Sequence, residues 1–213
     1  MTTEDRAFNC GDCTTLNCGK QNSTYPSFCL TESLTDVEIE EIVRIYKEDL
    51  QTASIAVASA EVAADGYGKW NRAQEIAEFT KRIGAKKVGI ASCVGLIREA
   101  KQFIVYLNSQ GIDNYSVLCK VGAIDKKEIG VPKRKEAHES ICNPVLQARI
   151  LEKEKTDLNV IIGLCVGHDA LFIKYSKAPV TYLIVKDRVN NHNPAAGLAS
   201  LSGMEKKSTI PRK

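Results

Sequence analysis

The sequence predicts an α/β protein whose core is a doubly wound parallel sheet of about four strands. Two observations support this fold class. The first is a phrase that occurs twice, at residues 88–95 and 160–167, in which apolar, largely β-branched residues lead to a cysteine and then to a glycine. The second is the helical pattern that follows each copy. Alternating buried strands and helices form a parallel sheet, because each helix returns the chain to the same edge.

Strand composition occurs in four segments, which are residues 87–92, 115–119, 158–164 and 179–186. A helical pattern through residues 96–107 follows the first segment and stops near Gly111. A long connection at 122–137, rich in charge, glycine and proline, follows the second. Asn143 and Pro144 then start a helix with an N-cap residue and a proline at the first helical position. Another helix begins near His168, after the third strand, and the arrangement is Rossmann-like.

Helices precede the sheet. Residues 35–38 form a capping box before an apolar pattern with helical spacing. A stretch of small residues at 53–64 and a helix at 71–83, which Gly84 ends, follow it. We therefore divide the chain into a cysteine-rich segment (1–32), an α/β domain with N-terminal helices (33–203) and a basic tail (204–213).

Composition limits the function classes. A net charge of +3 over 213 residues does not indicate a nucleic-acid surface, and no run approaches the roughly 20 apolar residues of a membrane helix. With no signal peptide before residue 10, we expect a cytoplasmic protein that binds neither nucleic acid nor a membrane. Eight cysteines in a reducing compartment indicate metal binding or thiol chemistry rather than structural disulfides.

The N-terminal segment carries four cysteines with the spacing C-x2-C-x4-C-x10-C. They are Cys10, Cys13, Cys18 and Cys29. The segment has no apolar period and cannot bury a core of its own, so a bound metal centre would supply its folding energy. Four thiolates suit either an iron–sulfur cluster of the 4Fe-4S type or a structural zinc ion. The second Cys-x2-Cys pair of a zinc ribbon is missing, which favours the iron–sulfur cluster.

The other four cysteines follow the predicted strands or precede a helix. They are Cys93, Cys119, Cys142 and Cys165. In an open α/β sheet, ligands bind outside the carboxyl ends of the strands. We therefore expect these thiols to lie along one edge, where helix N-termini lower thiol pKa values. The alternative is that they are small buried apolar side chains.

Three chemistries suit such an edge. The first is a second metal or cofactor site of four thiolates. The second is a site with mixed ligands, since His168 lies three residues after Cys165 and His138 lies four before Cys142. The third is covalent catalysis, because residues 163–167 match the glycine-x-nucleophile-x-glycine elbow with Cys165 as nucleophile. His168 or His192 would then be the base, and Asp169 or Asp187 would orient it.

Longer stretches carry a family resemblance. They are the cysteines at 10, 13, 18 and 29, Cys142-Asn-Pro144 with Gln147-Ala148, residues 157–169, and the segments 172–181, 185–188 and 192–194. The chain resembles domain-of-unknown-function family 1847, cysteine-rich metal-binding proteins of anaerobic bacteria and archaea. The resemblance implies metal binding, and it implies no particular reaction.

The sequence thus predicts a metal-binding protein with an iron–sulfur cluster, zinc being the alternative metal. Redox or sulfur-related chemistry is expected at the cysteine-lined sheet edge, with a redox partner protein or a small molecule as substrate. One alternative is a zinc-stapled hydrolase or transferase that uses Cys165 and His168. Another is a binding module without catalysis. Whether the protein is an enzyme, and its oligomeric state, stay open at this stage.

Overall fold

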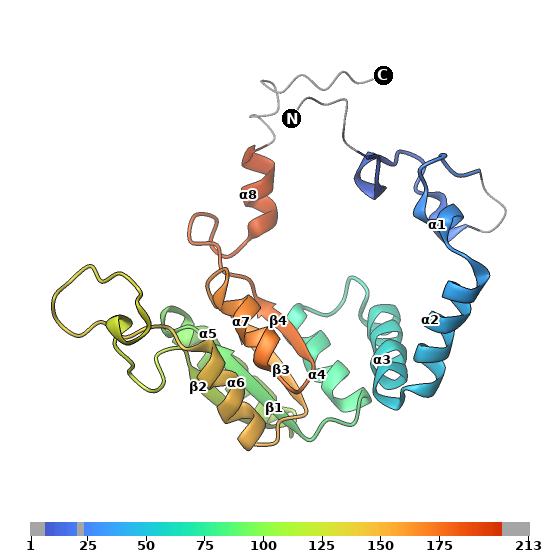
Figure 1. The fold of residues 1–213 in the computed structure, drawn as a ribbon. Coiled ribbons are helices and arrows are strands. Elements are labelled where there is room, and N and C mark those ends of the chain that lie inside the picture. Colours follow the sequence, from blue (N-terminus) through green and yellow to red (C-terminus); the bar gives the residue numbers. More distant parts are fainter. Residues whose placement is uncertain (1–6, 21–23, 202–213) are drawn as a thin grey trace. The chain divides into compact units, whose positions relative to one another are not determined.

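A computed structural model describes residues 7–20 and 24–201 of the chain (Figure 1). The chain divides into two compact units, Met1–Val57 and Ala58–Lys213, which meet inside one continuous helix, α3 (Leu50–Gly66). The basic tail predicted at 204–213 lies outside the described residues. Among the described residues, no helix is long and apolar enough to cross a membrane.

The first unit consists of short helices and one longer amphipathic helix. Its elements are η1 (Cys10–Asp12), η2 (Asn17–Gly19), α1 (Leu30–Ser33), α2 (Asp36–Glu48) and the start of α3. The predicted capping box begins α2: Thr35 Oγ1 accepts from the backbone N–H of Glu38, whose carboxylate accepts from the backbone N–H of Thr35. In the described part of this unit, η1, η2, α1 and α2 contain no buried residue. Their apolar side chains therefore contribute little burial, as expected of a segment without its own core.

The second unit is built on the predicted parallel sheet, which is confirmed. Its strands are β1 (Lys87–Ser92), β2 (Asp113–Leu118), β3 (Leu158–Ile162) and β4 (Val180–Ile184), in the order β2-β1-β3-β4. All neighbours are parallel, with Ile90 opposite Ser116 on one side and Val160 on the other. The two central strands, β1 and β3, are the most deeply buried, which explains their unbroken apolar sequences.

Helices cover both faces of the sheet (Figure 1). The helices α4 (Arg72–Arg82) and α5 (Ile97–Ser109) pack with β1 and β3 around Ile90, Phe103 and Val160. On the other face, α6 (Pro144–Lys153) and α7 (His168–Tyr175) pack around Ile161, Leu151 and Phe172. This two-sided covering is the doubly wound architecture that the sequence predicts.

Several element boundaries differ from the expected ones. The strands end two residues earlier at β3 and β4 than the apolar runs do, because their last residues turn toward the site described below. The segment after Arg188, expected to run over the surface, contains a further helix, α8 (Pro194–Leu201). The long connection after β2 holds one short helical turn, η4 (Lys126–Ile129).

A buried amide fastens α6 to the carboxyl ends of two strands. The Gln147 side chain is fully buried, and its Nε2 donates to Ser92 O at 3.2 Å and to Val117 O at 2.7 Å. Because these carbonyls belong to the ends of β1 and β2, the amide fixes the start of α6 against that edge. The cysteine immediately before α6 is thereby also fixed.

Candidate functional site

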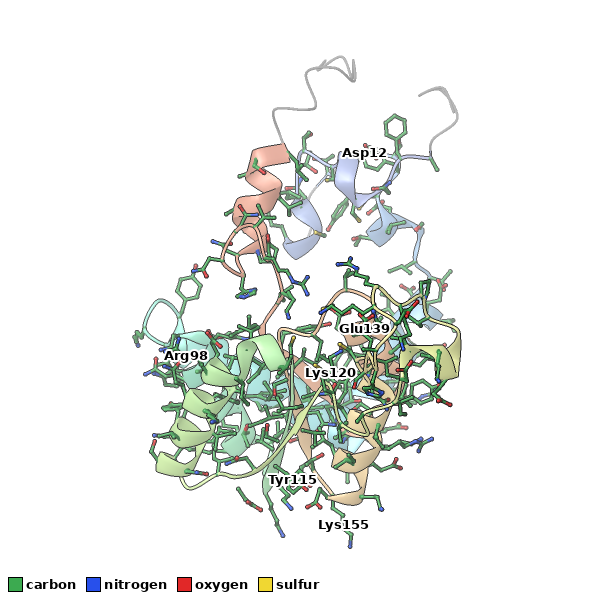
Figure 2. The ribbon with its side chains drawn as sticks, turned by 90° about the vertical axis from the view of Figure 1, so that its left-hand side faces the viewer. Asp12, Arg98, Tyr115, Lys120, Glu139 and Lys155 are labelled. Carbon is green, nitrogen blue, oxygen red and sulfur yellow. The ribbon has the colours of Figure 1, made fainter. Side chains whose placement is uncertain are left out.

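The candidate site lies at the carboxyl end of the sheet, where the direction of the chain connections changes. From β1 the chain leaves through α5 on one face, whereas from β3 it leaves through α7 on the other. In doubly wound sheets this switch point is the usual ligand crevice. Cys93 follows β1 and Cys165 follows β3, so both stand beside it. In Figure 2, Lys120 and Glu139 mark this end, and Lys155, in the turn before β3, marks the opposite one.

Cys93 is buried after β1 and is held by β3 and by the segment that follows β4. Its backbone N–H donates to Ile162 O at 3.1 Å, and the Lys186 ammonium donates to its Sγ at 2.7 Å. Burial raises the pKa of this thiol, but the hydrogen bond and the charge of Lys186 help to bring the pKa of Cys93 below its ordinary value. A lysine therefore favours the thiolate form of this sulfur.

Gly163 packs closely against Leu96, beside the Lys186 side chain. Its φ of +59° suits glycine, and a Cβ at this position would lie 1.9 Å from Leu96 Cδ1 and 3.5 Å from Lys186 Cε. The first glycine of the predicted elbow is thus required by packing at the edge.

Cys119 and Cys142 lie next to each other. Cys119 directly follows β2 and is buried, whereas Cys142 is half-buried and lies two residues before the start of α6. The backbone N–H of Asn143 donates to Cys119 O at 2.7 Å, which brings the two cysteines together. The Cys119 sulfur also accepts from the backbone N–H of Val94 at 3.4 Å, and the pKa values of Cys119 and Cys142 affect each other.

The proton of this pair resides on Cys119. Its hydrogen bond to Cys142, followed by burial, raises the pKa of Cys119 above the ordinary thiol value. The same hydrogen bond lowers the pKa of Cys142 to about 5, against the opposing effect of burial, and the charges of Lys120 and His168 act in the same direction. At neutral pH the pair therefore consists of a thiolate at Cys142 and a thiol at Cys119.

A loop organised around Asp125 brings Cys142 to this position. The Asp125 carboxylate, 8% exposed, accepts from the backbone N–H groups of Lys127 and Glu139 at 2.9 and 3.1 Å and pairs with Lys133 at 3.0 Å. These contacts, the Lys127 N–H foremost, hold the pKa of Asp125 well below its usual range. His138, proposed above as a ligand partner of Cys142, instead lies 3.2 Å from Asp125. Contacts to one buried carboxylate, that of Asp125, thus hold the loop together.

Cys165 is half-buried after β3, and its polar partner is a cation. The Arg188 guanidinium donates to its Sγ at 3.1 Å, and this contact with Cys165 raises the pKa of Arg188. Arg188 is also close enough to respond to the charges of Cys93 and Cys142. The fourth thiol therefore faces the same group of charges as the other three.

The groups proposed as base and orienter for Cys165 have other contacts. The contact between His168 and Cys165 is a backbone one, N–H to O at 2.9 Å, and the Asp169 carboxylate accepts from the backbone N–H of Gly167 at 2.9 Å. His192 Nδ1 accepts from the backbone N–H of Asp187 at 3.1 Å. Arginine does not lose its proton in proteins, so Arg188 is a cationic hydrogen-bond donor to Cys165 and does not act as a base.

Lys186, Arg188 and Lys120 are the residues of this edge that sequence reasoning missed. The bases predicted for Cys165 were both histidines, and Asp187 was predicted only as an orienting group. The signal was present in the basic residues placed just after β2 and β4, since the carboxyl ends of parallel strands meet at one edge.

The four N-terminal cysteines line one small cavity of about 80 Å³ in the first unit. Its wall is otherwise largely apolar, with Leu16, Tyr25, Pro26, Phe28 and Leu30. Leu16 has a φ of +50°, a conformation that is uncommon for leucine. Hydrogen bonds from the backbone of Leu16 and from Thr15 lower the pKa of Cys13. Strained backbone conformations cluster at ligand-binding sites, and the backbone at Leu16 also hydrogen-bonds to the Cys13 sulfur.

The four thiols suit a thiolate-bound metal centre, and both an iron–sulfur cluster and a structural zinc ion take four such ligands. Hydrogen bonds to the ligand sulfurs tune such centres, and hydrogen bonds from Leu16 and Thr15 already reach Cys13. Within the described part of the chain, no three His, Cys, Asp or Glu side chains are arranged to hold a metal ion.

Comparison with known proteins gives the chain its family. Residues 29–183 match the family described as "Protein of unknown function (DUF1847)". An uncharacterised protein of Methanocaldococcus jannaschii, MJ0455, is 48% identical over 160 residues, which cover 75% of this chain and 82% of that protein. The match spans the sheet and the cysteines at its edge, and the chain belongs to the DUF1847 family.

Proposed function

We propose that this protein carries out redox chemistry with the cysteine thiols at the carboxyl edge of its sheet, and that its N-terminal cysteines hold an iron–sulfur cluster. One observation carries the proposal. Four thiols from separate loops meet cationic side chains at the switch point, where Lys186 contacts Cys93 at 2.7 Å and Arg188 contacts Cys165 at 3.1 Å. Thiolates react with oxidants and disulfides, whereas thiols do so poorly.

The surroundings support thiol chemistry over simple packing. A cysteine that serves only as a small apolar side chain needs no cation and keeps its proton. Here Cys93 and Cys142 have lowered pKa values, and each has a lysine nearby: Lys186 at Cys93 and Lys120 at Cys142. Cys142 and Cys165 are also half-buried rather than sealed, so a small molecule or a partner protein can reach them.

The N-terminal unit supports the cluster. Cys10, Cys13, Cys18 and Cys29 line one cavity in a unit whose short helices bury nothing among the described residues. A bound cluster would supply one-electron transfer and would stabilise this unit. The residues themselves position the four sulfurs around a cavity whose wall is otherwise largely apolar.

Metal and sulfide analysis of the full chain, purified without oxygen, tests the cluster. We expect about four irons and four acid-labile sulfides per chain with broad visible absorption. The double variant C10S/C13S should lose both iron and colour, whereas C93S, at the sheet edge, should keep them. One zinc per chain with no colour would contradict the cluster.

Thiol reactivity tests the sheet edge separately. With iodoacetamide at pH 6, Cys93 and Cys142 should be alkylated before any ordinary thiol, because their lowered pKa values favour the thiolate. If neither reacts faster than free cysteine at this pH, the edge does not perform thiol chemistry.

A further inference from the structure

We propose that Cys142 and Cys119 are the attacking and the resolving thiols of a thiol–disulfide exchange centre, and that its substrate is a disulfide. The inference rests on the redox function proposed above. It names the substrate class and assigns the two roles. The geometry of the pair carries it: the backbone N–H of Asn143 donates to Cys119 O at 2.7 Å, so the two cysteines are neighbours, and Cys142 is half-buried whereas Cys119 is buried.

Access separates Cys142 and Cys165 from the other two cysteines of the edge. Cys119 is 2% exposed and Cys93 is 7% exposed, with the Lys186 ammonium against its sulfur. Cys142 and Cys165 are both half-buried. Of these two, Cys142 lies next to another cysteine, Cys119, which can resolve a mixed disulfide, whereas the side-chain partner of Cys165 is Arg188.

The start of α6 prepares Cys142 for attack. Cys142 directly precedes the N-cap Asn143, whose side chain accepts from the backbone N–H of Leu146 at 3.0 Å. The positive end of this ten-residue helix favours a thiolate, both on the attacking sulfur and on a departing one. The charged or titratable groups that act on Cys142 are Lys120, His168, Cys119 and Arg188.

Cys119 has the properties of a resolving thiol. It is buried, its pKa is raised above the ordinary thiol value, and it lies next to Cys142. The backbone contact from Asn143 N–H to Cys119 O at 2.7 Å keeps the two residues together during the reaction. Cys165 lacks this arrangement, because its side-chain partner is Arg188.

The exchange balances in two steps. The Cys142 thiolate attacks one sulfur of the substrate disulfide, the substrate S–S bond breaks, and the leaving thiolate takes a proton from water. Cys119 then attacks the Cys142 sulfur, forms the Cys119–Cys142 disulfide, and passes its proton to the second departing thiolate. Two protein thiols are oxidised and one disulfide is reduced to two thiols. A dithiol reductant reverses both steps.

Tryptic mapping of the exchange product tests the assignment. Trypsin places the four edge cysteines on separate peptides: Cys93 on 88–98, Cys119 on 102–120, Cys142 on 136–149 and Cys165 on 156–174. The full chain, purified without oxygen, is treated with bis(2-hydroxyethyl) disulfide at pH 6, quenched, alkylated and digested without reductant. At this pH, Cys142 should exchange about tenfold faster than an ordinary thiol, because its larger thiolate fraction outweighs its lower nucleophilicity.

The wild-type protein should give peptides 102–120 and 136–149 joined by a disulfide, and dithiothreitol should release them. In C119S the hydroxyethyl adduct should remain on peptide 136–149, since no resolving thiol is present. In C142S the joined peptides should be absent. The matched control C165S should give the wild-type pattern. Because the wild-type mapping needs no variant, a folding defect in C119S or C142S leaves the test intact.

Two results would overturn the assignment: a first adduct on peptide 88–98 or 156–174, or a wild-type disulfide between peptides other than 102–120 and 136–149. Iron and sulfide, measured on the same preparation, separate this failure from that of the cluster. Iron without the expected disulfide refutes the exchange centre alone. The expected disulfide without iron refutes the cluster alone.

Discussion

The Lys186 ammonium sets the protonation of Cys93 from a different strand end. A buried thiol without a charge partner has a raised pKa, and here the contact at 2.7 Å acts against this effect. Gly163 lies beside this contact, and a Cβ there would stand 1.9 Å from Leu96 Cδ1 and 3.5 Å from Lys186 Cε. At this scale, the protonation of Cys93 depends on one charge, and the packing beside it depends on one glycine.

Replacing the lysine tests the charge. In K186M the stem remains but the ammonium is lost, so the hydrogen bond and the charge of Lys186 no longer lower the pKa of Cys93, and this pKa should rise. The alkylation rate of peptide 88–98 at pH 7.5 should fall about tenfold or more, and its midpoint in a pH titration should move upward.

The control is K174M, since Lys174 contacts Tyr175 on α7. The rate of Cys93 alkylation should be unchanged there. An equal rate in K186M and in the wild type would show that Lys186 does not act on Cys93.

Replacing Gly163 tests whether the close packing against Leu96 requires a glycine. G163A puts a methyl group 1.9 Å from Leu96 Cδ1 and imposes a φ of +59° on alanine, so the free energy of unfolding should fall by about 2–4 kcal/mol. G167A shares a positive φ, +86°, but meets no atom within 4 Å, and should cost about 1 kcal/mol. Chemical denaturation measures both, and equal losses would mean that the contact with Leu96 is unimportant.

The Asp125 loop positions a cysteine without contributing to the sheet. Residues 120–141 leave β2 and return to it, with Ile141 N–H donating to Ile124 O at 2.9 Å. Its interior is polar and is organised by a carboxylate rather than by an apolar core. Such an element depends on one residue more strongly than a helix does.

D125N should loosen this loop. The amide keeps the shape but loses the negative charge that Lys133 and two backbone N–H groups contact. Trypsin should cleave after the basic residues at 126–135 faster than in the wild type, while the sheet stays intact by circular dichroism. E128Q, a charge-matched change on the exposed part of the loop, serves as the control, and equal cleavage in D125N and wild type would contradict this role.

Acid should act on the same carboxylate. Because the pKa of folded Asp125 lies below that of the unfolded chain, its contribution to stability is present above about pH 4 and is lost as the pH falls further. The melting temperatures of wild type and D125N should therefore converge on acidification from pH 6 to pH 3. A constant difference across this range would exclude the charge as the cause.

At the scale of the whole molecule, the two units differ in what holds them together. The second unit has two apolar cores on the faces of its sheet, whereas the described helices at the start of the first unit bury no side chain. Removal of the proposed iron–sulfur cluster should therefore destabilise the first unit more than the second.

Chelation tests this difference. After iron is removed by a chelator under reducing conditions, backbone amides of the segment 24–48 should exchange hydrogen faster, and those of β1 and β3 should stay protected. Hydrogen exchange with mass spectrometry reads both regions in one sample. Loss of protection in β1 and β3 would mean that the metal stabilises the whole chain.

Local signals in the sequence were sufficient to predict most of the helices and strands. The capping box at Thr35 and the Asn143-Pro144 start of α6 were predicted because their contacts lie within four residues. The parallel sheet followed from alternation of strand and helix. Strand order is a long-range property that no single segment carries, so the adjacency of β3 and β4 was not predictable.

The candidate site was predicted only in part for the same reason, because its contacts depend on which strands are neighbours. The cysteines could be assigned to one edge, since each follows a strand or precedes a helix. Lys186 and Arg188 could not be paired with Cys93 and Cys165, because both contacts depend on which strands are neighbours. The Cys119–Cys142 contact depends on how the Asp125 loop closes, which is a matter of tertiary hydrogen bonds.

The contact between Asn143 and Cys119 has a consequence for the Asp125 loop. A covalent bond between Cys119 and Cys142 would convert residues 119–142 into a closed ring. By the chain-entropy account, a ring of this size limits the unfolded chain enough to add about 3 kcal/mol of stability. Formation of this disulfide would then slow proteolysis of the basic stretch at 126–135. The rate of cleavage there would report the oxidation state of two cysteines outside that stretch.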